Sequence, residues 1–294
     1  NIPYVLNYHH EEKMEAFLED SVNFEHQFSC SKPKNTTKKP PIPFTTSTLQ
    51  QKASNEMNIS PKETMAISQK LYEGGYITYM RTDSTTYSKE FLEKTKLYIT
   101  DKYDNIDELS ERKSEKKTTK KKKKEEDKNA QEAHEAIRPT DIKLEKVPDE
   151  MSPREKKLYY IIWSNTLESC MSDAKYLSIT SKITAPDSYE YRYSSEQVEF
   201  PGWKIVKGYE KENPIYNLLL LLKNNTNIDY KKITSKVSIK ELKTHYTEAK
   251  LVQLLEEKGI GRPSTFSSLI DKIQDREYVL KENVKGKKIK CVDY

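Results

Sequence analysis

The run KSEKKTTKKKKKEEDK, at residues 113–128, limits most strongly what this chain can fold into, because it contains no apolar side chain. Such a segment cannot bury enough surface to offset the entropy lost when it is ordered. It predicts a mobile surface loop. A solvated insertion is a better interpretation than a specific DNA-binding arm, because charge runs are common on protein surfaces. The fold must therefore be built from the residues on either side.

The composition indicates that much of the whole chain is exposed, as the charged run is. Only 34% of the 294 residues are hydrophobic and 33% are charged, whereas about 45–50% of the residues in a globular domain are apolar. A large area must face solvent or a charged partner, which favours an open, multi-lobed shape with two or three domains. The net charge of +5 suits a polyanion such as nucleic acid, but it equally suits an ordinary basic protein.

The cysteines and the apolar runs argue against other classes of protein. Cys30, Cys170 and Cys291 lie far apart, so neither a disulfide framework nor a zinc ribbon is indicated, and a reducing compartment is expected. The chain has no run of about 18 apolar residues that could span a membrane. It starts at Asn1 without the apolar region of a signal peptide. We expect a soluble chain that begins inside a longer gene product and has no membrane partner.

Helix starts are the clearest local signals. The residues SPKE at 60–63 provide an N-cap, a proline at the first helical position and a capping-box acid, and two glycines at 74–75 supply the stop. A helix over residues 61–73 follows. The residues SPRE at 152–155 repeat this signature before a long amphipathic stretch. The stretch AQEAHEAIRPTD, residues 130–141, predicts another helix that its proline ends.

Strand signals surround these helices. The alternation from Tyr176 to about Val206 predicts antiparallel strands, and VNFEHQFSC, residues 22–30, alternates like a strand. Between residues 31 and 43 the prolines and lysines of SKPKNTTKKPPIP predict an exposed connector or a long hairpin arm.

The stretch YTEAKLVQLLEEKGIGRPSTFSSLIDKIQDREYV, residues 246–279, predicts a helix, a turn, a second helix and a wing. Thr247 can cap the first helix, the two glycines make the turn, Ser264 or Thr265 can cap the second helix, and EYV starts a strand. Nucleic-acid binders often use this pattern. Arg262 lies directly before the second helix, where free N–H groups bind anions, so this turn is a candidate phosphate cradle. A purely structural turn is an equally good interpretation.

The stretch EGGYITYMRTDSTTYS, residues 73–88, carries the candidate chemistry. In an extended segment Tyr79, Arg81 and Asp83 point to one face and the residues between them point to the other. A phenol has a pKa of about 10, so its attack on phosphorus needs a positive environment, which Arg81 can supply. A half-buried strand with an exposed ion pair is the simpler interpretation of this segment taken alone.

Four separated motifs favour the tyrosine nucleophile over the half-buried strand. They are PFTTSTLQQKAS (43–54), LYEGGYITYMRTDS (71–84), QEAHEAIRPTD (131–141) and GIGRPSTFSSLIDKIQDREYV (259–279). Together and in this order they resemble bacterial-type DNA topoisomerase I, the type IA class, over more than two-thirds of the chain. The segments PFTTSTLQQ and YMRTDS resemble topoisomerase I more closely than topoisomerase III or reverse gyrase.

The resemblance implies roles for individual residues. Tyr79 would attack one DNA strand to form a 5′-phosphotyrosine link and a free 3′-hydroxyl, before strand passage and religation relax negatively supercoiled DNA. Arg81 would stabilise the pentavalent phosphorane and steer the scissile phosphate. His134 would bind phosphate and handle the proton near the departing 3′-oxygen. A histidine that merely satisfies a helix end is the alternative when the motif is ignored.

Four further residues are candidate DNA contacts: Arg138, Arg262, Asp83 and Thr265. Arg138 follows His134 at i+4, so a helix here would place both on one face, within reach of one phosphate backbone. The DNA is expected to be single-stranded at the cleavage site. Some of the 20 tyrosines could stack on its bases.

The chain departs from the family in several places. It has no counterpart of the TOPRIM domain, whose acids hold magnesium, so we expect Mg²⁺ on that domain, in the same or a separate chain, and not on this one. Terminal zinc ribbons are also missing, and the usual RYTEA reads HYTEA at residues 245–249. The chain would then be an internal fragment or one half of a split or degenerate gene. A catalytically incomplete DNA clamp is the alternative function, and the position of Tyr79 argues against a tyrosine recombinase or type IB enzyme.

The architecture implied by the resemblance is an α+β toroid of several domains. A β-rich arch begins in residues 1–45, and a helical catalytic domain with the active-site tyrosine occupies 46–145. Residues 146–231 form a helix plus the return strands of the arch, and 232–294 form a truncated, helical, winged-helix-like DNA-binding domain. We expect a monomer in the DNA compartment of a bacterium, a virus or an organelle.

Overall fold

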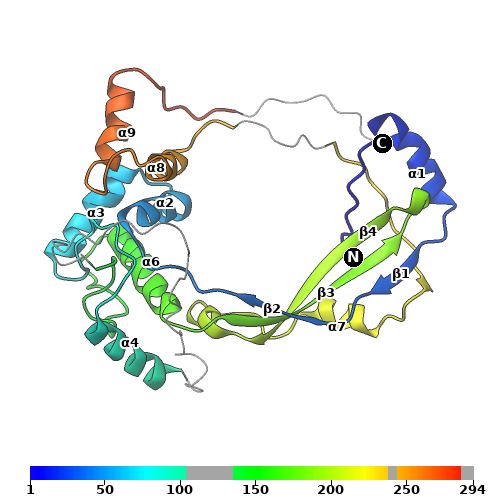
Figure 1. Ribbon diagram of the computed structural model, residues 1–294, viewed down its shortest axis with the longest axis horizontal. Coiled ribbons are helices and arrows are strands. Elements are labelled where there is room, and N and C mark those ends of the chain that lie inside the picture. The colour runs from blue at the N-terminus through cyan, green and yellow to red at the C-terminus, as the bar shows by residue number, and fades with distance from the viewer. Residues whose placement is uncertain (104–134, 238–243, 286–294) are drawn as a thin grey trace, which may run out of the picture.

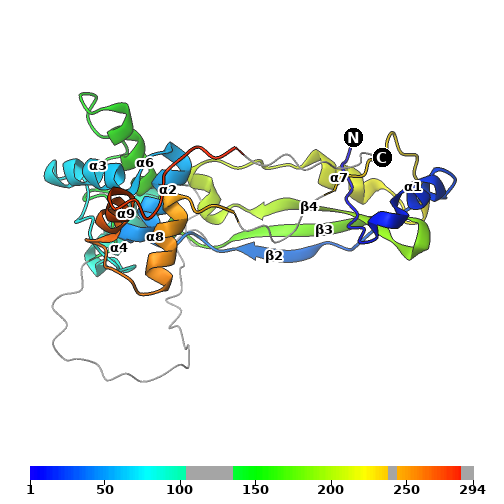
Figure 2. The ribbon, with the colours of Figure 1, turned by 90° about the horizontal axis from the view of Figure 1, so that it is seen from above.

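The structure, a computed structural model, describes residues 1–103, 135–237 and 244–285. It is an elongated α+β molecule with a helical lobe at one end and an antiparallel sheet at the other (Figure 1, Figure 2). The helical lobe contains α2 (Thr46–Met57), α3 (Pro61–Glu73), α4 (Lys89–Lys102), α6 (Pro153–Ser169), α8 (Glu248–Glu257) and α9 (Phe266–Asp275). The expected α+β fold, with a sheet arch and helical lobes, is confirmed.

The arch is built from two long strands and three short ones. These are β1 (Gln27–Cys30), β2 (Lys34–Lys38), β3 (Ala174–Thr184), β4 (Glu190–Phe200) and β5 (Thr226–Asn227). β3 pairs with β4 along one side and with β1 and then β2 along the other, and β5 pairs with β1. Next to the sheet lie α1 (Met14–Val22), α7 (Pro214–Leu221) and the 3₁₀ turns Glu11–Lys13 and Pro186–Ser188. The antiparallel strands predicted from Tyr176 onward are confirmed.

The segment predicted as a connector is partly a strand. Lys34–Lys38 pair with Ser178–Ala174 and are exposed throughout. A sheet edge tolerates lysines because their side chains reach solvent and discourage pairing with other chains. The preceding strand β1 contributes the buried Phe28, which packs with Ile179 of β3 and with Tyr216 of α7.

The two predicted helix starts are confirmed, but the capping box is complete only at α6, because Glu63 of α3 pairs with Arg154 instead. Ser60 and Ser152 accept hydrogen bonds from the third backbone N–H of α3 and α6, and each helix has proline at its first position. After α3, Gly75 has φ of 75°, and the N–H groups of Gly75 and Tyr76 donate to the carbonyls of Tyr72 and Leu71. This Schellman ending turns the chain sharply into the segment that carries the candidate nucleophile.

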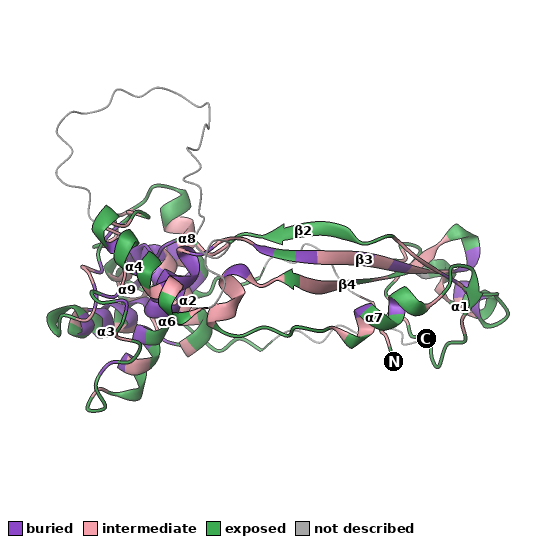
Figure 3. Ribbon diagram, turned by 90° about the horizontal axis from the view of Figure 1, so that it is seen from below, coloured by how far each residue is buried: buried purple, intermediate pink, exposed green. Residues whose placement is uncertain are grey.

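The main hydrophobic core of the molecule lies in the helical lobe. Buried side chains gather there and are sparse in the arch (Figure 3). The fully buried members include Leu49 of α2, Leu71 of α3, Met80 and, from α6, Leu158, Ile162 and Leu167. The 3₁₀ turn Gly202–Val206 packs on α6 where β4 returns to the lobe. Because Met80 belongs to this core, the candidate segment is part of the folded lobe and not an appended loop.

The predicted helix at 130–141 is wrong where the structure describes it. Residues 135–139 are extended, and Ile137 and Pro139 form β-bridges to Phe44 and Ile77. The helical conformation is disfavoured for a residue that precedes proline, as Arg138 does. Two neighbouring extended segments supply hydrogen-bond partners for residues 135–139. The charged run 113–128 lies outside the described residues, so its prediction as a loop stays a prediction.

The predicted wing is also wrong within the described residues. Glu277 adopts a left-handed φ of 56°, and the N–H groups of Glu277 and Tyr278 donate to the carbonyls of Gln274 and Ile273. The letters EYV therefore close α9 instead of starting a strand. Thr247 does cap α8 as predicted, by accepting from the N–H of Lys250. No helix in the described ranges is long and apolar enough to cross a bilayer.

Candidate functional site

The segment that carries Tyr79 is held on both sides by hydrogen bonds. On one side the Thr46 hydroxyl donates to the carbonyl of Met80 at 2.7 Å and accepts from the N–H of Thr82 at 2.9 Å. On the other side the N–H of Thr78 donates to the carbonyl of Arg138 at 2.9 Å. The extended segment is thus the middle of three neighbouring segments, which fixes its direction and register.

Burial alternates along this segment as its extended conformation predicts. Met80 is 0% exposed and Thr82 is 2% exposed, whereas Tyr79 is half-buried and Arg81 and Asp83 are exposed. The Tyr79 ring packs edge-on against Tyr72, with 5.3 Å between ring centroids. The core side chains therefore orient the other face of the segment toward solvent.

Arg81 is available for an anion. Within the described parts of the chain, its exposed guanidinium has no hydrogen bond or ion pair. An arginine with unpaired donors next to a fixed phenol can bind two oxygens of one phosphate.

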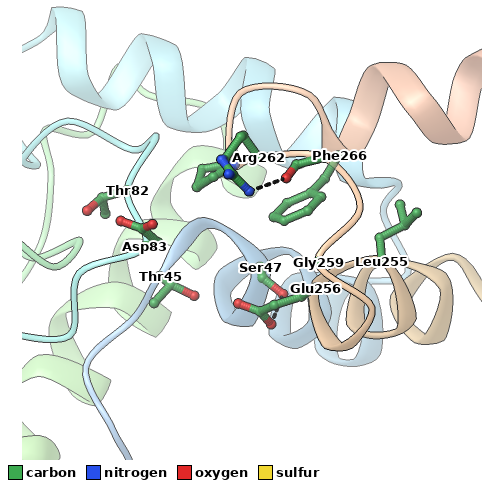
Figure 4. A pocket seen from close by; sticks show the side chains of 11 residues that line it. Thr45, Ser47, Thr82, Asp83, Leu255, Glu256, Gly259, Arg262 and Phe266 are labelled. Carbon is green, nitrogen blue, oxygen red and sulfur yellow. Dashed lines mark hydrogen bonds between the residues drawn. The ribbon is translucent and has the colours of Figure 1, made fainter. Parts of the chain in front are cut away.

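A pocket lies where this segment meets the C-terminal helices (Figure 4). Its volume of about 120 Å³ holds a few water molecules, each of which occupies about 30 Å³ in the liquid. The lining comes from the start of α2, from the end of the Tyr79 segment, from α8 and from the loop before α9. The lining residues are Thr45, Ser47, Thr82, Asp83, Leu255, Glu256, Gly259, Gly261, Arg262, Pro263 and Phe266.

The loop before α9 is shaped by its two glycines. Gly259 and Gly261 have φ of 67° and 83°, a region that favours glycine. A Cβ on Gly261 would lie 2.8 Å from Leu269 Cδ1. The loop therefore needs glycine at position 261 for its backbone conformation, while the end of the Leu269 side chain would have to shift to admit a Cβ.

The expected phosphate cradle at Arg262 differs from the prediction. Thr265 occupies the N-cap position of α9 but makes no capping hydrogen bond. Its hydroxyl accepts from the Arg262 N–H at 2.8 Å, while the Thr265 N–H donates to the Arg262 carbonyl. These backbone and hydroxyl groups satisfy one another. The loop can therefore bind an anion through the exposed Arg262 guanidinium, which donates one hydrogen bond to the Gly261 carbonyl at 3.1 Å.

A comparison with known proteins identifies the family. The model of the DNA topoisomerase family matches residues 6–291 of the chain. The chain belongs to the type IA DNA topoisomerase family. The full-length topoisomerase I from Thermotoga maritima has a similar structure, with a TM-score of 0.67, 29% sequence identity and coverage of 92% of this chain and 44% of that one.

Curated relatives agree. DNA topoisomerase 1 from Buchnera aphidicola (Acyrthosiphon pisum) is 41% identical over 247 residues, which cover 83% of this chain and 27% of that protein. The enzyme from Helicobacter pylori J99 is 38% identical over 92% of this chain and 36% of its own length. The Escherichia coli K12 protein is 38% identical over 85% and 28%. The chain thus spans about a quarter to a third of these topoisomerases.

The remaining candidate residues of this topoisomerase chain are distributed unevenly. Asp83 and Arg262 line one pocket, and Tyr79 and Arg81 lie on the segment that leads to it. Arg138 instead packs inward: it pairs with Glu135 at 2.5 Å, and its guanidinium carbon lies 4.0 Å from the centroid of the Phe91 ring. Its side chain is only 14% exposed, so its main contacts are within the protein. His134 lies outside the described residues. Arg138 is not in a helix, so the prediction that the two residues share one helical face fails at Arg138.

The described residues of this topoisomerase chain do not fit a metal ion. They contain no group of three or more His, Cys, Asp or Glu side chains placed to hold one. In the pocket the carboxylates are those of Asp83 and Glu256, and Glu256 accepts a hydrogen bond from the Ser47 hydroxyl at 2.6 Å. We therefore derive no step of the chemistry through a metal.

Sequence reasoning missed three residues of the site: Thr46, Ser47 and Glu256. Thr46 positions the Tyr79 segment, and the other two line the pocket. Thr46 and Ser47 stand inside the motif PFTTSTLQQ, where the run of hydroxyl residues at a helix start was the available signal. Glu256 lies three positions before the first glycine of the motif GIGRPST and had no signal of its own.

Proposed function

We propose that this chain is the part of a type IA DNA topoisomerase that supplies the tyrosine nucleophile and part of the DNA-binding surface. Acting in the whole enzyme, it would relax negatively supercoiled DNA by transient cleavage of one strand, strand passage and religation. The observation that carries the proposal is the fixed segment with Tyr79 and Arg81 on its outward face, which leads into a pocket lined by Arg262.

The chemistry of cleavage is a transfer of the phosphodiester from one oxygen to another. The Tyr79 oxygen forms a bond to phosphorus, the bond from phosphorus to the 3′-oxygen breaks, the phenol loses its proton and the 3′-oxygen gains one. Religation reverses these steps. The bond energies nearly balance because one phosphodiester replaces another, so no external energy source is needed.

Arg81 supports this transfer electrostatically. Charge builds up on the equatorial oxygens of the phosphorane, and a guanidinium two residues from the nucleophile can bind two of them at once. Arg262, on the opposite wall of the pocket, would hold a neighbouring phosphate of the single strand. His134 would handle the proton near the 3′-oxygen. These residues provide the nucleophile and part of the positive charge.

The rest of the site is proposed to come from a TOPRIM domain in the same or another chain. In this proposal its acids, a lysine and Mg²⁺ belong to that domain. The isolated chain should bind single-stranded DNA without relaxing a plasmid, because phosphate contacts from its own side chains need no metal. Joining a TOPRIM domain should restore relaxation. An inert fusion would favour the catalytically incomplete DNA clamp.

Covalent capture of DNA by the fusion protein tests the nucleophile. Tyr79→Phe should abolish the protein–DNA adduct on a denaturing gel and leave affinity for single-stranded DNA nearly unchanged. The matched control is Tyr72→Phe, because this exposed tyrosine packs against Tyr79 and loses the same oxygen. An adduct that persists in Tyr79→Phe, or disappears only in Tyr72→Phe, would refute the assignment.

A further inference from the structure

A carboxylate of the protein itself, that of Glu256, binds the first turn of α2 at the pocket. Ser47, the second residue of α2, is 1% exposed, and its hydroxyl donates to Glu256 Oε2 of α8 at 2.6 Å. Gln51 supports the same hydroxyl by donating to it at 3.0 Å. Glu256 is itself exposed and lines the pocket with Arg262. Figure 4 shows the Ser47 and Glu256 side chains facing each other.

The start of α2 has one backbone donor to spare. The N–H of Thr46 donates to the Thr82 carbonyl, and the N–H of Thr48 donates to the Thr45 hydroxyl. The N–H of Ser47 has no acceptor among the described residues. A helix N-terminus carries partial positive charge and favours an anion. The Glu256 carboxylate, which accepts from the Ser47 hydroxyl, is an anion beside this helix start.

We propose that Glu256 competes with a DNA phosphate for Ser47, and that Ser47 becomes a phosphate ligand when Glu256 leaves. The proposal rests on the proposed function, because it assumes that the single strand enters this pocket. Two anions cannot share the same donors at contact distance without strong repulsion. A phosphate that lies between Arg262 and Ser47 would therefore displace Glu256 from the Ser47 hydroxyl.

The exchange requires only the Glu256 side chain to move. Glu256 is exposed on α8, and α8 packs against α2. Rotation of its carboxylate away from Ser47 therefore frees the hydroxyl while the two helices stay in contact. The cluster of Val252, Phe266 and Ile270 holds α8 and α9 together throughout.

The test compares two neighbouring acids on α8. Glu256→Gln keeps the shape and an amide oxygen for Ser47 but removes the charge. Glu257→Gln is the matched control, because Glu257 is exposed, bonds to Gln253 and does not line the pocket. Fluorescence anisotropy with a labelled single-stranded oligonucleotide should show about three- to tenfold tighter binding for Glu256→Gln, as expected for one close repulsion. The control should change affinity less than twofold.

Ser47→Ala tests the proposed ligand itself. In the Glu256→Gln background it should remove most of the gain in affinity, because the donor that the phosphate would use is missing. Thermal unfolding of each variant checks that the fold is retained. Equal affinities for Glu256→Gln and Glu257→Gln, or a gain that survives Ser47→Ala, would overturn the inference and leave the proposed function standing. If no variant, nor the wild type, binds the oligonucleotide, the proposed function fails as well.

Discussion

The two walls of the pocket are held in different ways. The wall that carries Asp83 continues from a segment whose Met80 is fully buried in the main core and whose backbone is bonded to Thr46. The wall that carries Arg262 belongs to α8 and α9, which have a small separate core. The second wall is joined to the first by the packing of α8 on α2, by the Ser47–Glu256 hydrogen bond and by an exposed ion pair between Lys62 and Asp271.

This difference matches two opposed requirements. A nucleophile reacts fastest when its position is fixed before the substrate binds, because less entropy is then lost in reaching the reactive geometry. A surface that admits and releases a strand must instead be able to open, and elements with few buried contacts open most easily. We therefore assign chemistry to the fixed wall and access to the other.

The largest expected effect separates the two cores. Met80→Ala should destabilise the helical lobe by about 2–5 kcal/mol, the range for truncating a fully buried large side chain. Ile270→Ala, at a residue 2% exposed in α9, should instead increase proteolysis of α8 and α9 while the main thermal transition changes little. Calorimetry combined with limited proteolysis measures both. Equal shifts of the main transition would show that the lobe is one cooperative unit.

Arg81→Lys should separate chemistry from folding on the fixed wall. Cleavage by the fusion protein should slow by about 10- to 100-fold, because an ammonium cannot reproduce the guanidinium fork on phosphate oxygens. The unfolding temperature should not change, since Arg81 is exposed. Single-turnover cleavage is the measurement. A wild-type rate would make Arg81 a structural residue only.

Thr46→Val should loosen the fixed wall without creating a cavity. The N–H of Thr82 would lose its short hydrogen bond to the Thr46 hydroxyl, and an unsatisfied buried donor costs about 1–3 kcal/mol. Denaturant unfolding measures this loss. Thr46→Ser, which keeps the hydroxyl, is the control and should retain most of the stability. If valine and serine behave alike, the hydroxyl does not hold the segment.

The smallest effect is expected at the ion pair between the walls. Lys62→Ala should change stability by about 0–1 kcal/mol, because exposed pairs are screened by solvent and salt. Lys62 is 75% exposed and its partner Asp271 is 33% exposed. The unfolding free energy at low and high salt provides the check. A loss well above this range would mean that this ion pair attaches α9 firmly to α3.

The sequence predicted those parts of the fold that local chemistry decides. The helices at 61–73 and 153–169 begin at serine caps followed by proline, and the extended Tyr79 segment alternates between buried and exposed residues. These features depend on neighbours a few residues away. The likeness of the four motifs to the family supplied the candidate nucleophile.

The sequence could not predict what distant partners decide. Residues 135–139 have helix formers, yet they are extended because Phe44 and Ile77 offer bridging partners from elsewhere in the chain. Thr265 satisfies Arg262 within its own turn instead of capping α9. Glu256 reaches the site only through the packing of α8 on α2, so its role has no trace in the local sequence.

Native-state amide hydrogen exchange on the chain alone tests the contrast between the walls most directly. The amide of Thr82, bonded to Thr46 and 2% exposed, should exchange only through opening of the main core. The amides of α9 should exchange much faster, through separation of α8 and α9 from the lobe. Equal protection of Thr82 and the α9 amides would contradict the account, because both walls would then open together.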